Sequence, residues 1–268
     1  MTVAGPGSTH IERSIRTAAT GGRPALAGFL TAGFPQMASF ADLVDAVASV
    51  VDVVEIGVPF TDPMADGVTI QESSRQALRD GVNLQWILDV VRAQRHDTPI
   101  VLMSYLNPLL ALGIDDLGRQ AAAAGVSGFI VPDLPCEECL PVRSVLQDAG
   151  LALIQLVTPI TPPDRVRHLC ELSQGFVYAV TRTGVTGASS DRTSDMLDYL
   201  DRVRAVSPIP VLAGFGIRAP SHVSTVASHV DGVIVGSALI EVLARGDDPV
   251  AFLRNLRDEN GTTSEELT

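Results

Sequence analysis

Two carboxylates in one short segment give the strongest indication of chemistry. Glu55 lies within the apolar run Val51–Ile56, and Asp66 follows in a segment rich in Gly and Pro. An unpaired carboxylate inside an apolar strand is costly to bury, so Glu55 is either a hydrogen-bonded structural residue or one held for catalysis. Asp66 lies on a loop longer than most strand-to-helix connections, which is typical of a lid or a binding loop. Asp62 in the same loop fits three roles: capping a turn, contacting a substrate, or facing a partner.

The basic residues narrow the chemistry further. All 19 are arginine, and the chain contains no lysine. Without a lysine amine no Schiff-base mechanism is possible, whether of the aldolase type or through a pyridoxal cofactor. None of the five histidines falls at the end of a predicted strand where catalytic groups gather, so we predict neither a histidine base nor a metal site. Carboxylates, hydroxyls and backbone groups remain as the candidates for catalysis.

Glycine-rich segments mark two further places of interest. The stretch Thr181–Ser190 is rich in Gly, Ser and Thr, and is either a loop that closes over a substrate or a flexible connector. Gly214–Ile217 and Gly236-Ser237 each follow a predicted strand, and glycine lets the backbone approach an anion closely. Gly236-Ser237 also begins a predicted helix, whose first N–H groups point outward. We therefore predict a phosphorylated substrate.

Charge and cysteine content exclude several classes of protein. A net charge of −12 argues against nucleic acid or an anionic membrane surface as a partner. We expect no membrane span, because no apolar stretch is long enough. The N-terminus lacks the pattern of a signal peptide, so a cytoplasmic protein is expected. Cys136 and Cys139 have CxxC spacing, but no further ligands at matching spacing complete a zinc site, and we interpret them as incidental thiols.

These residues must be positioned by a repeating alternation of short apolar strands and helices. The predicted strands are Ala25–Thr31, Val51–Ile56, Ile100–Ser104, Gly128–Val131, Ala152–Val157, Gly175–Val180, Pro210–Ala213 and Gly232–Val235. The predicted helices are Phe40–Val50, Leu84–Gln94, Asp116–Ala124, Glu137–Ala149, Pro163–Leu172, Asp195–Ala205, Pro220–Ala227 and Pro249–Leu256. Three aspartates lie near predicted helix starts, where they suit the helix dipole or cap the helix: Asp164, Asp195 and Asp248.

Eight such units at this length most simply close into a single (β/α)8 TIM barrel of the α/β class. An open doubly wound sheet is the second possibility, but no GxGxxG follows the first strand. The whole chain, 1–268, is expected to form one domain. Residues 1–20 form a helical extension centred on Ile11–Ala19, and 260–268 form a frayed tail. In a barrel, functional groups gather at the C-terminal ends of the strands, and phosphate binds after strands seven and eight.

Several motifs occur in a specific order along the chain. The longest is Glu55–Gln71 (EIGVPFTDPMADGVTIQ), and the others are Leu30–Pro35 (LTAGFP), Val131–Pro135 (VPDLP), Arg182–Gly187 (RTGVTG), Gly214–Ile217 (GFGI) and Gly236-Ser237. In this order the set resembles the tryptophan synthase alpha chain family, whose members are indole-3-glycerol-phosphate lyases. The resemblance covers essentially the whole predicted barrel.

The resemblance implies a retro-aldol cleavage to indole and glyceraldehyde 3-phosphate that needs no cofactor. In the family, the glutamate that matches Glu55 protonates indole C3 and takes the proton from the glycerol hydroxyl. The aspartate that matches Asp66 receives the indole N–H and stabilises the indolenine-like cation. Tyr178 matches an active-site tyrosine, and Thr186 matches a threonine of the loop that orders in the closed state.

The resemblance also implies the binding surfaces. The phosphate contacts match Gly187, Gly216, Gly236 and Ser237. Five residues match or neighbour the apolar indole pocket: Phe29, Met103, Ile130, Phe215 and Ile234. The surface that faces a beta chain, which carries the pyridoxal chemistry in an expected α2β2 heterotetramer, matches Asp62, Tyr105, Asn107 and Pro108.

Three positions depart from the family pattern in ways that bear on function. Thr61 and Val68 stand where serine and proline are usual, in the loop that signals to the partner. Arg218 stands where a small residue usually follows the GFGI motif, and it either pairs with the phosphate or points to solvent. Two alternatives therefore stay open: a stand-alone lyase that releases free indole, and a catalytically idle subunit that activates a partner.

Overall fold

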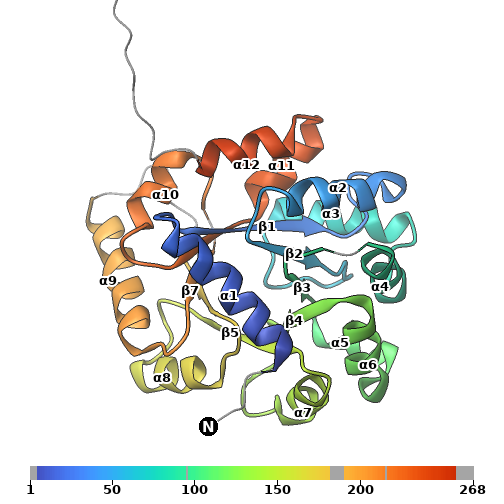
Figure 1. Ribbon diagram of the computed structural model, residues 1–268, viewed down its shortest axis with the longest axis horizontal. Helices are drawn as coiled ribbons and strands as arrows, with labels where there is room; N and C mark the ends of the chain where they lie inside the picture. Colours follow the sequence, from blue (N-terminus) through green and yellow to red (C-terminus); the bar gives the residue numbers. More distant parts are fainter. Residues whose placement is uncertain (1–4, 95, 182–189, 215, 258–268) are drawn as a thin grey trace, which may run out of the picture.

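The computed structural model describes residues 5–94, 96–181, 190–214 and 216–257, and within these ranges eight parallel strands close into a barrel in the order β1 to β8 (Figure 1). The strands are β1 Ala25–Thr31, β2 Val53–Gly57, β3 Ile100–Met103, β4 Val126–Ile130, β5 Ala152–Val157, β6 Val177–Val180, β7 Val211–Gly214 and β8 Gly232–Val235. Almost every strand residue is buried, as expected when one face meets the barrel interior and the other meets the surrounding helices. The predicted TIM-barrel fold is confirmed.

Helices surround the barrel and connect its strands. They are α1 Pro6–Thr20, α2 Phe40–Ala48, α3 Val68–Arg79, α4 Leu84–Ala93, α5 Leu106–Leu112, α6 Ile114–Ala124, α7 Leu140–Asp148, α8 Pro163–Leu172, α9 Ser190–Val206, α10 Pro220–Val226, α11 Ser237–Arg245 and α12 Pro249–Arg257, with a short 3-10 turn at Met37–Ser39. Asp248 caps α12 as predicted, because its Oδ1 accepts from the N–H groups of Val250 and Ala251 at 2.8 and 3.1 Å. Asp164 lies in the first turn of α8, also as predicted.

Three expectations about the helices were wrong. Helix α3 follows the Asp66 loop and was not predicted, because Ser73 and Ser74 occupy buried positions on its inner face and weaken the apolar pattern. Helix α5 was also missed, since it is only 7 residues long. Asp195 lies well inside α9 rather than near its start, because that helix begins at Ser190.

The N-terminal helix closes the bottom of the barrel, and Figure 1 shows α1 crossing in front of the strands. Its apolar residues Ile11, Ile15 and Ala18 pack in one cluster with inward-facing barrel residues such as Ala27 and Val101. An amphipathic helix buries such a stripe against whatever apolar surface is open to it. The end of the barrel opposite the catalytic end is therefore sealed by the chain's own extension.

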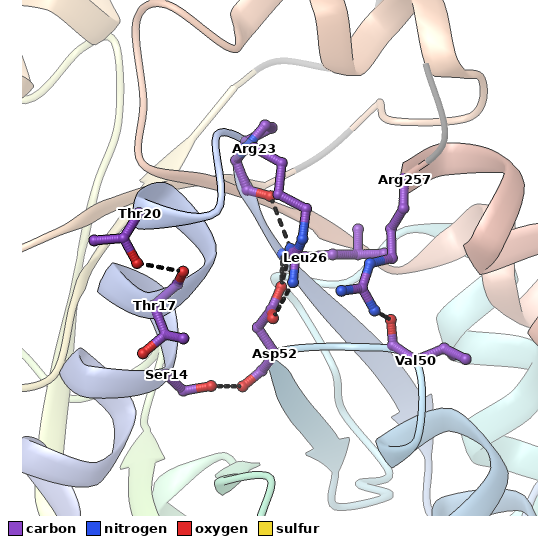
Figure 2. Close-up of polar contacts among 9 residues, drawn as sticks. Ser14, Thr17, Thr20, Arg23, Leu26, Val50, Asp52 and Arg257 are labelled. Atoms are coloured by element: carbon purple, nitrogen blue, oxygen red, sulfur yellow. Dashed lines mark hydrogen bonds and ion pairs between the residues drawn. The ribbon is translucent and has the colours of Figure 1, made fainter. Parts of the chain in front are cut away.

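A polar cluster fixes α1 and the strand starts at that sealed end (Figure 2). Asp52, just before β2, accepts two hydrogen bonds from Arg23 at 2.7 Å and one from the Leu26 N–H at 2.8 Å. Ser14 of α1 donates to the Asp52 carbonyl at 2.7 Å, and Arg257 of α12 donates to the Val50 carbonyl. The cluster thus joins both ends of the described chain to the second strand.

Among the described residues, no helix is long and apolar enough to cross a membrane. The three cysteines are free thiols. In the described part of the chain, no group of three or more His, Cys, Asp and Glu side chains is arranged to hold a metal ion.

Candidate active site

Glu55 is buried in the barrel wall without a hydrogen-bond partner for its carboxyl group among the described residues. It is the central residue of β2, is paired in register with Phe29 of β1 and Val101 of β3, and is 2% exposed. Burial raises the pKa of Glu55 from 4.5 to about 8, and the nearby charge of Asp66 adds to this rise. The carboxyl group therefore holds a proton at neutral pH.

Asp66 lies on the loop between β2 and α3, where a tyrosine partly supports it. The Tyr105 hydroxyl donates to Asp66 Oδ2 at 3.2 Å and accepts from the Ala65 N–H at 2.9 Å. The Gln71 side chain donates to the Asp66 carbonyl at 2.9 Å and so ties the loop to α3. Burial raises the pKa of Asp66 from 3.8 to about 6, while the Tyr105 hydrogen bond opposes the rise.

The two carboxyl groups therefore differ in charge at neutral pH. Glu55, with a pKa of about 8, is mostly protonated, and Asp66, with a pKa of about 6, is mostly ionised. Their environments cause this difference, because Glu55 has no donor and Asp66 has Tyr105. Two neighbouring carboxyl groups whose pKa values are pushed apart can serve as a proton donor and a fixed negative charge.

Aromatic rings fill the space around these carboxyl groups because nearby strand ends carry glycine. Tyr178 of β6 is 5% exposed, and burial raises its pKa, as do the charges of Glu55 and Asp66. A Cβ on Gly214 of β7 would stand 2.3 Å from the Tyr178 ring, and a Cβ on Gly57 would stand 2.5 Å from the ring of Phe29. Both glycines are therefore required for the rings to reach the barrel mouth.

One cavity brings together the predicted carboxylates, part of the predicted apolar wall and the predicted phosphate contacts. It is lined by Phe29, Glu55, Asp66, Ile70, Met103, Tyr178, Gly216, Ile217, Arg218, Gly236, Ser237 and Ala238. The segments after β7 and β8, at Gly216 and Gly236, supply one end of it. Ile70, Ile217 and Ala238 were not among the predicted site residues. Ile70 and Ile217 lie within quoted motifs and Ala238 directly follows one, and these positions were the available signal.

Other predicted site residues lie elsewhere. Ile130 and Ile234 are at most 2% exposed and belong to the barrel interior rather than to the cavity lining, so they form the floor beneath the site. Three predicted residues lie outside the described part of the chain: Thr186, Gly187 and Phe215.

Tyr105 does not lie on the surface to which the partner-facing expectation assigned it. It is 4% exposed in this chain, stacks on Phe60 with ring centroids 5.1 Å apart, and directs its hydroxyl at Asp66. A side chain that is apolar over most of its length is buried here while its polar tip finds a partner. Asp62 and Asn107 are exposed and Pro108 is half-buried, so their role toward a partner stays a prediction.

Arg218, whose role the sequence left open, is held by a carboxylate. Its two terminal nitrogens donate to Glu241 of α11 at 2.6 and 2.8 Å. The pairing raises the pKa of Arg218 and lowers the pKa of Glu241. Arg218 thus neither points freely into solvent nor lies far from the cavity that it helps to line.

Fold and site together define a class. A parallel (β/α)8 barrel with a protonated and an ionised carboxyl group at its C-terminal mouth, next to backbone cradles after strands seven and eight, is an enzyme for acid–base chemistry on a phosphorylated substrate.

Comparisons with known proteins specify the family. The family model described as tryptophan synthase alpha chain matches residues 15–266. The chain is 42% identical over 250 residues to the tryptophan synthase alpha chain of Nitratidesulfovibrio vulgaris, covering 92% of this chain and 97% of the relative. For the corresponding protein of Desulfovibrio desulfuricans the identity is 43% over 249 residues, covering 91% and 97%. The chain belongs to the tryptophan synthase alpha chain family.

Solved structures of tryptophan synthase superpose well on this chain. A crystal structure of tryptophan synthase subunit alpha from Legionella pneumophila superposes with a TM-score of 0.83 at 33% identity, covering 92% of this chain and 97% of that one. Tryptophan synthase from M. tuberculosis in its aminoacrylate-bound form gives a TM-score of 0.83 at 35% identity with the same coverage. The chain is a carbon–carbon lyase of tryptophan biosynthesis that cleaves indole-3-glycerol phosphate, in a family that works with a beta chain.

Proposed function

We propose that Glu55 and Asp66 divide the work of this cleavage between a mobile proton and a fixed charge. The observation that supports the division is the difference in pKa, about 8 for Glu55 and about 6 for Asp66, between two carboxyl groups that line one cavity. Before reaction, Glu55 is a neutral acid and Asp66 is an anion. A general acid and a charge that stabilises a cation need these two protonation states.

The proposed reaction begins with proton transfer from Glu55 to C3 of the indole ring. This makes the ring an indolenine-like cation, whose N–H lies against the Asp66 carboxylate. Glu55, now a carboxylate, takes the proton of the hydroxyl on the glycerol carbon attached to the ring. The O–H electrons form the aldehyde, the carbon–carbon bond breaks, and its electrons return to the ring. Indole and glyceraldehyde 3-phosphate leave, and Glu55 has its proton again.

The same cavity offers groups for the rest of the substrate. We propose that Phe29 and Met103 contact the indole ring, with Ile130 and Ile234 in the barrel interior. Phe215 and Thr186 are proposed to contribute as well. Tyr178 is proposed to act beside Glu55. At the other end, Gly216, Gly236 and Ser237, together with Gly187, would receive the phosphate. Ser237 begins α11, and a helix N-terminus favours an anion.

We further propose an α2β2 assembly with a beta chain, in the cytoplasm. Asp62 lies on the loop after β2, and Asn107 and Pro108 lie in the first turn of α5, the helix that follows β3. Met64, on the same loop as Asp62, and Val68, the first residue of α3, are 82% and 69% exposed. Large exposed apolar side chains within a polar rim are typical of a protein–protein interface. The free thiols are compatible with a reducing compartment.

The test is an assay of the purified chain on indole-3-glycerol phosphate, with and without a tryptophan synthase beta chain. We expect weak indole release from the chain alone and a large increase when the beta chain is added. Strong activity that the beta chain does not change would indicate a stand-alone lyase. Absence of activity under both conditions would contradict the proposed roles of Glu55 and Asp66.

A further inference from the structure

Arg218 differs from every other described residue that lines the active-site cavity. Of those residues it is the only cationic side chain, and two of the others, Glu55 and Asp66, are carboxyl groups. The other lining residues from the segments after β7 and β8 are uncharged: Gly216, Ile217, Gly236, Ser237 and Ala238. Of the charged or ionisable side chains that a phosphate dianion would meet in this cavity, only Arg218 is attractive.

Arg218 is held both at its guanidinium and at its backbone. Glu241 of α11 accepts from Nη1 and Nη2 at 2.6 and 2.8 Å, and Thr69 of α3 donates to Glu241 Oε1 at 3.4 Å. The backbone N–H of Arg218 donates to His222 Nδ1 at 3.2 Å, and this nitrogen also lies 3.0 Å from the Gly216 carbonyl oxygen. The turn that carries Arg218 is thus fixed relative to α11, the helix that begins at Ser237.

The pairing with Glu241 leaves binding capacity. A guanidinium has five N–H groups, and the two hydrogen bonds to Glu241 use one on each terminal nitrogen. The Nε–H and the remaining N–H groups lie in the same plane and can bind a second oxyanion. Because Arg218 is restrained before the ligand arrives, little side-chain entropy is lost on binding.

On the basis of the proposed function, we infer that Arg218, restrained by Glu241, is an additional phosphate-binding residue of this chain that contributes charge to a site otherwise built from backbone N–H groups. It determines affinity for the phosphorylated form of the substrate rather than the rate of the carbon–carbon cleavage. The alternative is that the ion pair only joins the β7–α10 turn to α11. The exposed fractions of the two side chains, 46% and 31%, argue against that role, because partly exposed ion pairs contribute little to stability.

The experiment compares binding of indole-3-glycerol phosphate with binding of its dephosphorylated analogue, indole-3-glycerol, in a Glu55→Gln background that does not turn the substrate over. We expect Arg218→Ala to weaken binding of the phosphorylated ligand about tenfold and to leave binding of the analogue within about twofold. Arg218→Lys keeps the charge but loses the planar guanidinium, so its affinity for the phosphorylated ligand should lie between those of the parent and Arg218→Ala. In the active enzyme, Arg218→Ala should raise KM and leave kcat nearly unchanged.

Arg245→Ala is the matched control, because Arg245 ends the same helix α11 and pairs with Asp247 at 2.7 Å. Arg245→Ala should change neither the affinity for indole-3-glycerol phosphate nor the affinity for indole-3-glycerol. The inference is overturned if Arg218→Ala binds both ligands as the parent does, or weakens both equally, as loss of a purely structural link would. Inorganic phosphate, titrated as a competitor into the otherwise unmodified chain and into Arg218→Ala, should bind more weakly to the variant. This measurement tests Arg218 even if the chain fails to cleave indole-3-glycerol phosphate.

Discussion

Asp52 and Glu55 are two carboxylates close together in the chain, and they have opposite surroundings. Asp52 lies just before β2 and is 11% exposed, and Arg23, Leu26 and Ser14 satisfy its side chain or carbonyl (Figure 2). Glu55 lies within β2, is 2% exposed, and has no hydrogen-bond partner among the described residues. Both are acidic groups with little exposure to solvent, yet only Asp52 receives the hydrogen bonds and counter-charge that burial of a charge requires.

The difference fits a stabilising role for Asp52 and the proposed catalytic role for Glu55. At the N-terminal end the carboxylate is fully paired and joins α1, β1 and β2, which is what a stabilising residue does. At the C-terminal end the uncompensated carboxyl group keeps a pKa of about 8, which makes it a proton donor at neutral pH. Barrels generally place stabilising groups at the first end and catalytic groups at the second. The largest effects of substitution should therefore appear in different measurements at the two ends.

The largest expected effect is on turnover at Glu55. Glu55→Gln keeps the shape of the side chain but removes the transferable proton, so kcat for indole release should fall about 10³-fold, within the range usual for a lost acid–base group. Substrate should still bind. Steady-state kinetics with a beta chain present would measure the loss. Turnover like that of the parent would show that Glu55 does not move protons.

The second effect is on stability at Asp52. Asp52→Asn leaves Arg23 partly buried without a counter-charge, and the free energy of unfolding should fall by about 3 kcal/mol. Urea denaturation would measure it, while kcat of the folded variant should stay within roughly twofold because Asp52 is remote from the catalytic mouth.

Asp89→Asn is the matched control for Asp52. Asp89 also pairs with an arginine, Arg92, at 2.7 Å, but both side chains are about half exposed. An exposed pair within one helix adds little stability, so the unfolding curve should hardly move. Equal losses for the two variants would mean that the Asp52 cluster has no special structural role.

The sequence predicted the barrel and the catalytic candidate but not this contrast. Alternating apolar runs and helices indicated eight strands, and Glu55 stood out as a carboxylate within such a run. Asp52 fell inside the same predicted strand, Val51–Ile56, whereas β2 begins at Val53. The partner Arg23 lies 29 positions away in the chain, and such long-range pairing leaves no local pattern. Neither the compensation of Asp52 nor its absence at Glu55 could be inferred.

The same reason explains the misplaced Tyr105 and the missed α3. Tyr105 follows β3, and only closure of the barrel brings its hydroxyl to Asp66 on the loop after β2. Helix α3 buries Ser73, whose hydroxyl pairs with Thr31 of β1 at 2.7 Å. A buried serine that is satisfied by a distant threonine does not register in a hydrophobic pattern. The motifs were sufficient to predict where the site lies. The pKa values of its carboxyl groups depend on contacts between residues far apart in the chain, which the motifs do not contain.

A third effect should appear in the pH dependence of stability. The folded pKa of Glu55, about 8, lies above its ordinary value of 4.5, so between these values the folded chain holds a proton that the unfolded chain releases. Stability from this source is complete below about pH 4.5 and is lost as the pH rises through about 8. Glu55→Gln removes this dependence. At about pH 8.5 it should exceed the parent in free energy of unfolding by on the order of 4 kcal/mol, with little difference at about pH 4.5.

Urea midpoints of both proteins across this range would measure the difference. Asp66 contributes a dependence of the same sign between its ordinary value of 3.8 and about 6, and because both proteins contain Asp66 the comparison cancels most of it. Parallel pH profiles for the parent and Glu55→Gln would show that the Glu55 carboxyl group is not raised in pKa. Glu55 and Asp52 would then differ in their position in the barrel but not in how strongly burial affects their pKa values.

The smallest effect concerns the residue that keeps Asp66 ionised. Tyr105 donates to Asp66 at 3.2 Å and lowers its pKa, so Tyr105→Phe should raise that pKa further above about 6. Since the proposed reaction needs Asp66 as an anion, the acid limb of the pH profile of kcat/KM should move to higher pH, and activity at neutral pH should fall by about tenfold or less.

Tyr199→Phe is the matched control, because it removes a buried hydroxyl that donates to the Val157 carbonyl at 2.9 Å instead of to a carboxylate. It should leave the acid limb in place. If both variants left it in place, the hydroxyl of Tyr105 would serve only to hold the Ala65 backbone, and the low proton affinity of Asp66 relative to Glu55 would arise from its shallower burial.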